Sequence, residues 1–214
     1  QFSEYARLLV EWNEKINLTA ITEEEDIVIK HFLDSLSLFS HLPKARLSLI
    51  DVGTGAGFPG IPLNISGENI SVTLLDSLEK RVNFLKEVIN KLSLKNINAV
   101  HGRAEDFGHN KDYREKFDIS VARAVASLAV LCEYCLPFVK VGGIFAAMKG
   151  KDINDELNEA RKAILLLGGE LIKVEKFMLP CGNNERTIIM IKKCRQTPST
   201  YPRKSGKPTK SPII

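Results

Sequence analysis

The stretch Asp51-Val-Gly-Thr-Gly-Ala-Gly-Phe-Pro-Gly60 decides the fold class of this chain, and an apolar run, residues 47–50, comes directly before it. The glycines at positions 53, 55 and 57 allow main-chain conformations that other residues avoid, and they let a ligand approach the backbone closely. The segment therefore predicts a strand, a tight turn and the start of a helix, an arrangement that commonly holds nucleotide-like ligands.

Two classes of cofactor fit this turn. A G-x-G-x-x-G pattern can be placed on Gly55, Gly57 and Gly60, as in nicotinamide-dependent enzymes. Asp51, two residues before Gly53, instead matches the D-x-G-x-G-x-G turn of class I S-adenosylmethionine-dependent methyltransferases. The glycines alone leave both interpretations open, as well as a turn that only joins a strand to a helix.

Six further segments are predicted to be strands, because they are apolar and bounded by turn residues. They are residues 70–75, 97–101, 117–122, 141–148, 169–179 and 186–193. The last two flank Pro180-Cys-Gly-Asn-Asn184, which suits the loop of an antiparallel hairpin. A seven-stranded sheet that ends in a hairpin favours the Rossmann-like α/β fold of class I methyltransferases over a dehydrogenase.

Acidic residues follow the second and third predicted strands, where a nucleoside would lie. Asp76 ends the second strand and is expected to accept hydrogen bonds from ribose hydroxyls, a feature common to NAD and S-adenosylmethionine sites. Ala104 and Glu105 follow the third strand, within expected reach of an adenine ring. The alternative is that Glu105 or Asp106 is a solvated N-cap.

The region before the sheet is predicted to form an N-terminal helical cap, residues 1–46. Apolar residues recur at helical spacing over residues 2–16 and 23–42, and Thr22 with Glu25 forms a capping-box pattern for the second helix. The cap precedes a methyltransferase core, residues 47–194, and a basic, proline-rich C-terminal tail, residues 195–214.

Four polar residues of the cap, Asn17, Thr19, His31 and Asp34, are expected either to face the cofactor or to hold the cap together. The structural role is favoured, because His31 and Asp34 are three residues apart on one helix and can interact locally. No third ligand with metal-binding spacing accompanies them, so no metal site is predicted.

The composition is that of an enzyme domain with an ample core. The chain has 214 residues, of which 44% are hydrophobic, and no apolar stretch approaches the roughly 18 residues of a membrane span. Residues 2–10 carry Glu4 and Arg7 and lack the apolar region of a signal peptide, so a cytoplasmic protein without a membrane partner is expected. A monomer is the expected state, although no sequence feature determines it. Cys132 and Cys135 lie in an apolar helical stretch without a second cysteine pair, which favours buried free thiols over zinc or redox chemistry.

Positive charge is concentrated at the C-terminus. Residues 192–214 contain seven Lys and Arg residues and no Asp or Glu, whereas residues 1–191 carry a net charge of −3. Arg203 and Lys204 are therefore candidate contacts to RNA phosphates, and Tyr201 is available to stack on a base. The alternative is a solvated end without a partner.

Motifs spread over nearly the whole chain match one protein family. The most specific are Gly57-Phe-Pro-Gly-Ile-Pro62 and the C-terminal Tyr201-Pro-Arg-Lys204. The others are residues 13–21, 31–36 and 51–63, Asp76-Ser-x-x-Lys80-Arg81-x-x-Phe84-Leu85, Arg103-Ala-Glu105, Phe117-Asp-x-x-x-Ala-Arg123-Ala-Val125 and Lys149-Gly150. On these motifs the chain resembles the glucose-inhibited division protein B family of bacterial 16S ribosomal RNA guanine-N7 methyltransferases. Thr54 is one departure, since serine or alanine is more usual there.

The resemblance implies S-adenosylmethionine as cofactor and 16S ribosomal RNA, or the small ribosomal subunit, as partner. The cofactor contacts expected from the resemblance and the turn geometry together are Gly53, Gly55, Phe58, Asp76, Ala104, Glu105 and Arg123. Arg123 and Lys149, at the ends of the fourth and fifth strands, are the candidate catalytic and substrate-positioning groups. An ion pair with Glu105 or Asp76 is the alternative role for Arg123.

Two missing features narrow the choice of the methylated atom. Residues 122–125 lack the Asn/Asp-Pro-Pro-aromatic run that orients exocyclic amines, and the only Pro-Cys pair, Pro180-Cys181, lies in the hairpin, away from the strands where a catalytic cysteine is needed. Guanine N7 needs neither device, because its lone pair is available, so positioning is the main catalytic task. The alternatives are a methyltransferase for another RNA base or a small molecule, and a noncatalytic RNA-binding module that retains the cofactor fold.

Overall fold

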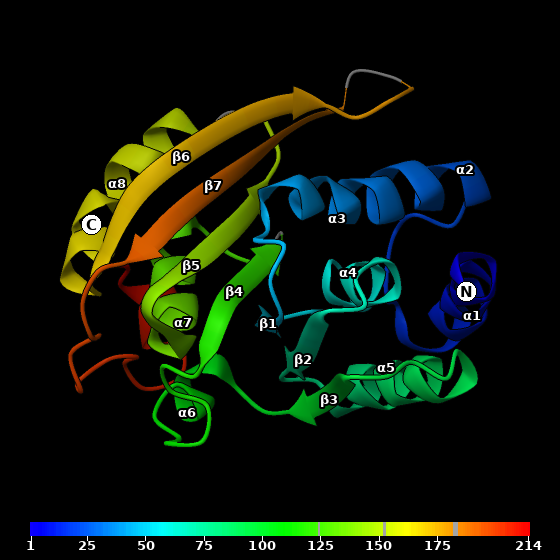
Figure 1. The fold of residues 1–214 in the computed structure, drawn as a ribbon, viewed down its shortest axis with the longest axis horizontal. Coiled ribbons are helices and arrows are strands. Elements are labelled where there is room, and N and C mark those ends of the chain that lie inside the picture. Colours follow the sequence, from blue (N-terminus) through cyan, green and yellow to red (C-terminus); the bar gives the residue numbers. More distant parts are fainter. Residues whose placement is uncertain (124, 152, 182–183) are drawn as a thin grey trace.

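A computed structural model of the chain has a seven-stranded sheet at its centre, in the order β3-β2-β1-β4-β5-β7-β6 (Figure 1). The structure describes residues 1–123, 125–151, 153–181 and 184–214. β1 to β5 are parallel, and β7 runs antiparallel to its neighbours β5 and β6. The strands are β1 (Leu47–Val52), β2 (Ile70–Asp76), β3 (Ile97–His101), β4 (Phe117–Arg123), β5 (Val139–Lys149), β6 (Gly169–Met178) and β7 (Glu185–Lys193).

The predicted α/β class, the seven strands and the terminal hairpin are confirmed. β3 has the predicted bounds, β5 extends two residues further at its start and one at its end, and each of the other strands differs by one or two residues at one end. β1 is longer than predicted, because Asp51 and Val52 continue its parallel pairing with β2. Gly182 and Asn183 of the predicted hairpin loop lie outside the described residues.

Helices fill the connections between the strands. They are α1 (Phe2–Ile16), α2 (Glu24–Ile27), η1 (Val28–Leu33), α3 (Asp34–Ser37), η2 (Leu38–His41), α4 (Gly60–Ser66), α5 (Glu79–Lys91), α6 (Ala104–Phe107), α7 (Leu128–Cys135), η3 (Leu136–Phe138), α8 (Asn154–Leu166) and α9 (Lys207–Lys210). α1 has the predicted bounds. The predicted second helix is a continuous run from α2 to η2, in which η1 is π-helical.

The capping box predicted for this second helix is wrong. The N-cap is Glu23, and no side chain caps the helix, because the first helical residue is Glu24 and Thr22 lies one position too early. Three acidic residues occupy the first turn instead, Glu24, Glu25 and Asp26. Their charges stabilise the positive end of the helix dipole.

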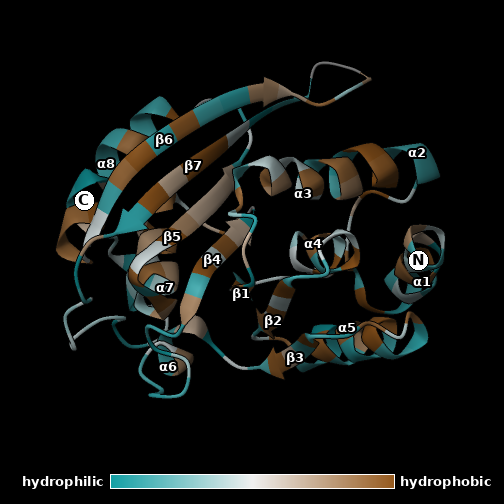
Figure 2. Ribbon diagram, viewed as in Figure 1, coloured by the Kyte–Doolittle hydropathy of each residue, from teal (hydrophilic) through white to brown (hydrophobic). Residues whose placement is uncertain are grey.

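Hydrophobic clusters cover both faces of the sheet. Leu49 of β1 packs in a cluster with α1, α4 and α5, whereas its neighbour Ile50 packs in a second cluster with α7 and α8. β6, at the edge of the sheet, alternates instead between hydrophilic and hydrophobic bands (Figure 2). The molecule is thus a three-layer sandwich with the sheet in the middle.

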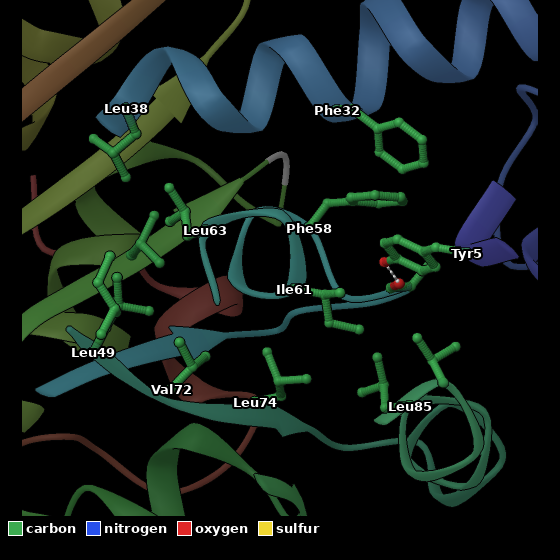
Figure 3. Packing of buried hydrophobic residues seen from close by; sticks show 14 of the residues in the cluster. Tyr5, Phe32, Leu38, Leu49, Phe58, Ile61, Leu63, Val72, Leu74 and Leu85 are labelled. Atoms are coloured by element: carbon green, nitrogen blue, oxygen red, sulfur yellow. Dashed lines mark hydrogen bonds between the residues drawn. The ribbon is translucent and has the colours of Figure 1, made fainter. Parts of the chain in front are cut away.

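The first cluster joins the N-terminal cap to the glycine turn (Figure 3). The ring of Tyr5, on α1, lies 5.5 Å from that of Phe32 and 5.3 Å from that of Phe58, centroid to centroid. The Tyr5 hydroxyl also donates a hydrogen bond to the Ala56 carbonyl. The cap therefore supports the turn that the sequence singles out.

The C-terminal segment packs against the core. Ile213 is 8% exposed in the second cluster, and Lys193 is fully buried, with its Nζ donating to Thr197 Oγ1. Arg114 donates to the carbonyls of Thr197 and Tyr201, at 2.7 and 2.8 Å. These contacts fix the course of a segment whose composition resembles that of a solvated tail.

Cys132 and Cys135 are buried and free, as predicted, and burial raises the pKa of both thiols. Within the described ranges, no group of His, Cys, Asp and Glu residues is arranged to hold a metal ion. A helix long and apolar enough to cross a membrane is likewise absent from the part of the chain that the structure describes.

Candidate active site

A cavity of about 910 Å³ opens at the edge of the sheet where β1, β2, β4 and β5 end. The predicted site residues that line it are Gly53, Gly55, Phe58, Asp76, Arg123 and Lys149. The predicted residues that do not line it are Ala104, Glu105, Arg203 and Lys204. Parallel α/β sheets bind their ligands outside the carboxyl ends of the strands, so this cavity is the candidate active site.

The glycine turn forms one wall of the cavity. Gly53, Gly55 and Gly57 have φ values of +69°, +61° and +98°, a region that residues with side chains rarely adopt. A Cβ atom on Gly55 would meet open space, whereas one on Gly57 would lie 2.5 Å from Ile61 Cδ1 and 2.7 Å from Tyr5 Oη. The turn therefore needs glycine for its conformation throughout, and at Gly57 also for close packing.

Asp51 holds this turn from inside. Its Oδ2 accepts hydrogen bonds from Thr54 Oγ1 at 2.7 Å and from the Gly60 amide at 2.8 Å. Burial raises the pKa of the Asp51 carboxyl to about 6. Its other oxygen, Oδ1, has no hydrogen-bond partner among the described residues. Thr54, which replaces the more usual serine or alanine of the family, thus donates a hydrogen bond to Asp51.

Asp76, the last residue of β2, faces the cavity with a fixed carboxylate. Oδ2 accepts a hydrogen bond from the Gly55 amide and Oδ1 accepts one from the Leu78 amide, both at 2.9 Å. Arg81 Nη1 lies 3.6 Å from Oδ2. Each carboxylate oxygen retains a further acceptor site, so this geometry suits two adjacent hydroxyls.

Glu105 is buried beside the C-terminal segment. Its Oε1 accepts a hydrogen bond from the Gly206 amide at 3.2 Å. Burial and the neighbouring Glu105 raise the pKa of Tyr134 to about 12. The alternative role of Glu105 or Asp106 as a solvated N-cap is wrong, because Arg103 holds the N-cap position of α6 and both acids lie inside the helix.

Arg123, the last residue of β4, is bound by the N-terminal cap. Its Nη1 donates to Asp34 Oδ2 at 2.9 Å and to the Lys30 carbonyl at 3.0 Å. Its Nη2 donates to His31 Nδ1 at 3.1 Å, and its Cζ lies 5.0 Å from the centroid of the Phe58 ring. One guanidinium thus joins the cap, the sheet and the glycine turn at the cavity wall.

These contacts correct two expectations. The carboxylate that pairs with Arg123 is Asp34, so the proposed alternative partners Glu105 and Asp76 are wrong. The Asp34 amide donates to the His31 carbonyl within their helix, and the two side chains bind Arg123, 89 and 92 residues away in the chain, rather than each other. Both residues line the cavity while holding the cap in place.

The contacts of His31 define its protonation. Burial, with a further contribution from Arg123, lowers the pKa of His31 to about 4, so the ring is neutral at pH 7. Arginine only donates hydrogen bonds, so Nδ1 is the unprotonated nitrogen and Nε2 donates to Thr19 Oγ1 at 2.9 Å. The ring also stacks on Phe58, with centroids 4.4 Å apart.

Lys149, the last residue of β5, is also paired. Its Nζ donates to Glu156 Oε1 and to the Ala126 carbonyl, both at 2.6 Å. The same Glu156 oxygen accepts a hydrogen bond from the Leu128 amide, at the start of α7. The third ammonium hydrogen makes no hydrogen bond within the described ranges.

Arg186 lines the cavity and is a residue that the sequence analysis missed. It is the second residue of β7, and its Nε lies 3.3 Å from Asp34 Oδ2. The predicted hairpin could have indicated this position. Because β7 is antiparallel to β5, the first residues of β7 lie beside Lys149 at the end of β5. Thr187 is the register partner of Lys149.

The basic C-terminal residues have different roles from those expected. Arg203 Nη2 lies 2.6 Å from Oε2 of Glu133, which is 1% exposed, and Arg203 Nε lies 2.9 Å from Oε1. This guanidinium is therefore engaged inside the protein, which is a correction to its expected role as an RNA contact. Lys193 is buried as well, whereas Lys204 is exposed.

Comparison with known proteins agrees with this geometry. A family model described as GidB, rRNA small subunit methyltransferase G, matches residues 1–189. Two relatives named ribosomal RNA small subunit methyltransferase G are 57% identical to the chain: one from Acetivibrio thermocellus over 213 residues (100% of this chain, 88% of the relative) and one from Alkaliphilus oremlandii over 214 residues (100% and 90%). The crystal structure of M. jannaschii TYW2 in complex with AdoMet shares the fold, with a TM-score of 0.57 at 14% identity over 76% of each chain. The resemblance seen in the motifs is thereby confirmed, and the chain belongs to the GidB family, rRNA small subunit methyltransferase G.

Proposed function

We propose that this protein transfers a methyl group from S-adenosylmethionine to N7 of a guanine in 16S ribosomal RNA. The observation that carries the proposal is the single cavity wall on which the Asp76 carboxylate, the Gly55 backbone and two cationic strand ends, Arg123 and Lys149, converge. Membership of the family supplies the substrate class and the cofactor.

The residues present fit this cofactor. Asp76 offers acceptor sites for two ribose hydroxyls, and Gly55 leaves open space above the turn. The unpartnered Oδ1 of Asp51 lies under the same turn and suits an ammonium or a bound water. Gly53 and Phe58 line the same cavity. Ala104 and Glu105 remain proposed adenine contacts, three and four residues beyond His101, the strand end that pairs with Asp76.

When bound, S-adenosylmethionine supplies an electrophilic methyl group on a sulfonium. Four described acids and histidines line the cavity, and each has a partner in this proposal: Asp34 is paired with two arginines, Glu156 with Lys149, His31 Nδ1 with Arg123, and Asp76 is assigned to the ribose hydroxyls. None of them is free to remove a proton. This arrangement favours a nucleophile such as guanine N7, which reacts through a lone pair and has no proton to lose, over an exocyclic amine.

Arg123 and Lys149 are then positioning groups. Arginine commonly binds guanine through O6 and N7 together, but a donor at N7 would occupy the lone pair that must react. A productive pose therefore uses these cations at O6 or at a flanking phosphate. After their contacts with the described residues, two N–H groups of Arg123 and one of Lys149 remain for this purpose.

The partner is proposed to be 16S RNA as part of the small ribosomal subunit or its precursor, in the cytoplasm. We also propose a monomer as the active form. Lys204 remains a proposed phosphate contact, because its side chain is exposed.

Product analysis tests the proposal. The protein is incubated with methyl-labelled cofactor and either naked 16S RNA or 30S subunits, and the RNA is digested to nucleosides. The expected product is 7-methylguanosine. Label in another nucleoside would assign a different target atom, and an absence of label with both substrates would leave a small-molecule methyltransferase or a noncatalytic RNA-binding module.

A further inference from the structure

Asp34 is shared by two arginines from distant parts of the chain. This carboxylate is 4% exposed, and its Oδ2 lies 2.9 Å from Arg123 Nη1 and 3.3 Å from Arg186 Nε. One negative charge therefore faces two positive charges, so the cluster keeps a net positive charge at the cavity wall.

The two arginines differ in how many donors they have left. Arg123 gives three N–H groups to the cap, and its side chain is 14% exposed. Arg186 forms an ion pair with Asp34 through Nε and donates a hydrogen bond from Nη1 to the Glu185 carbonyl at 3.0 Å. Its Nη2 makes no hydrogen bond within the described ranges, and its side chain is 23% exposed. Arg186 is thus oriented by Asp34 with its outer N–H groups available.

The surroundings of Arg186 suit an anion. The described cavity lining contains six Lys and Arg residues against three carboxylates, and His31 is neutral. Lys30, Lys149 and Lys151 line the same cavity as Arg186. A planar guanidinium with two parallel donors matches the oxygens of a phosphate group.

We infer that Arg186 binds a backbone phosphate of the substrate RNA next to the target nucleotide, and that Asp34 holds its guanidinium in the binding orientation. This inference rests on the proposed function. A phosphate contact is favoured over a base contact because Arg186 is the more exposed of the two arginines, whereas Arg123 stacks on Phe58 at the cavity wall.

The test compares Arg186→Gln, Arg186→Lys and a matched control, Arg46→Gln, with the wild-type protein. Arg46 is exposed and directly precedes β1, so it lies at the opposite edge of the sheet from the cavity. RNA affinity and methylation kinetics are measured over a range of salt concentrations, and cofactor affinity is measured by calorimetry. The fold should survive in Arg186→Gln, because Asp34 keeps its bond to Arg123.

Arg186→Gln should raise KM for RNA on the order of tenfold and flatten the slope of log affinity against log salt by about 0.7. Arg186→Lys should retain the slope, because it retains the charge, while KM still rises. Cofactor affinity should stay within about twofold in both variants, and Arg46→Gln should match the wild type.

An unchanged salt slope in Arg186→Gln, or a loss of cofactor affinity as large as the loss of RNA affinity, would overturn the inference. If Arg186→Gln does not fold, Arg186→Lys decides the question: a KM for RNA equal to that of the wild type would overturn it. Failure of the proposed function is distinguishable, because the wild-type protein itself would then form no 7-methylguanosine.

Discussion

Arg123 shows how one residue can have two functions in this molecule. Three of its five N–H groups bind Lys30, His31 and Asp34 of the cap, and two make no hydrogen bond with the residues that the structure describes. A cap contact and a substrate contact are therefore compatible on the same guanidinium. Its neighbour in the network, His31, gives this arrangement a pH dependence.

His31 should make the folded protein less stable in acid. Its pKa is about 4 in the folded state and about 6.5 when unfolded, so the unfolded state binds the proton first as the pH falls. Between pH 7 and pH 4 the free energy of unfolding of the wild type should fall by about 3 kcal/mol more than that of His31→Gln. Urea unfolding of both proteins at several pH values measures this.

The raised pKa of Asp51 acts in the opposite direction, because its folded state takes up the proton more readily. Both proteins contain Asp51, so its contribution cancels in the difference between them. Parallel curves of unfolding free energy against pH for the two proteins would contradict the assignment of His31.

Asp76 should determine cofactor affinity. Asp76→Asn keeps the shape of the side chain but removes the charged acceptor that faces the cavity, so S-adenosylmethionine should bind at least about tenfold more weakly. Calorimetry with the cofactor measures the change. Asp112→Asn, in an exposed loop before β4, is the matched control and should bind normally. Equal affinity in both variants would remove Asp76 from the ribose site.

At the scale of elements, a buried ion pair between Arg203 and Glu133 binds the C-terminal segment to α7. Glu133 accepts hydrogen bonds from the amide, Nε and Nη2 of Arg203. Removing the arginine would leave the Glu133 carboxylate buried and without its charged partner. Such an unpaired buried charge lowers the free energy of unfolding much more than the loss of an exposed ion pair does.

Arg203→Ala should therefore lower the free energy of unfolding by about 3 to 5 kcal/mol. Lys204→Ala, its exposed neighbour, is the control and should change stability by less than about 0.5 kcal/mol. Urea denaturation compares the two variants. Similarly small losses of unfolding free energy in both variants would mean that this ion pair does not stabilise the packing of the segment.

At the scale of the whole molecule, the sequence predicts what depends on local pattern. The strands and α1 were located correctly because apolar spacing and the glycine turn act over a few residues. The pairing of Arg123 with Asp34 was not predictable, because these residues are 89 positions apart and neither has a distinctive neighbour. The packing of the C-terminal segment was missed for the same reason, since its acidic partners Glu115, Glu133 and Glu105 belong to remote elements.

Because the C-terminal segment packs against the core, truncation is not a suitable test of its RNA-binding role. Truncation after Gln196 would remove Thr197, the partner of buried Lys193, together with Arg203, the partner of buried Glu133. Such a protein should be destabilised, so a loss of RNA affinity would say nothing about direct contacts. Substitution of exposed residues separates the two effects.

Lys204, Lys207 and Lys210 are the exposed basic residues after position 203, and their joint replacement by Gln should leave the fold intact. If each contacts a phosphate of single-stranded RNA, the slope of log affinity against log salt should flatten by about 2. The control replaces Lys44, Arg46 and Lys116 by Gln, since these exposed residues precede parallel strands at the far edge of the sheet and remove the same charge. If the slopes of the two triple variants are the same, net charge alone governs the salt effect, and the specific RNA contacts lie at the cavity around Arg186.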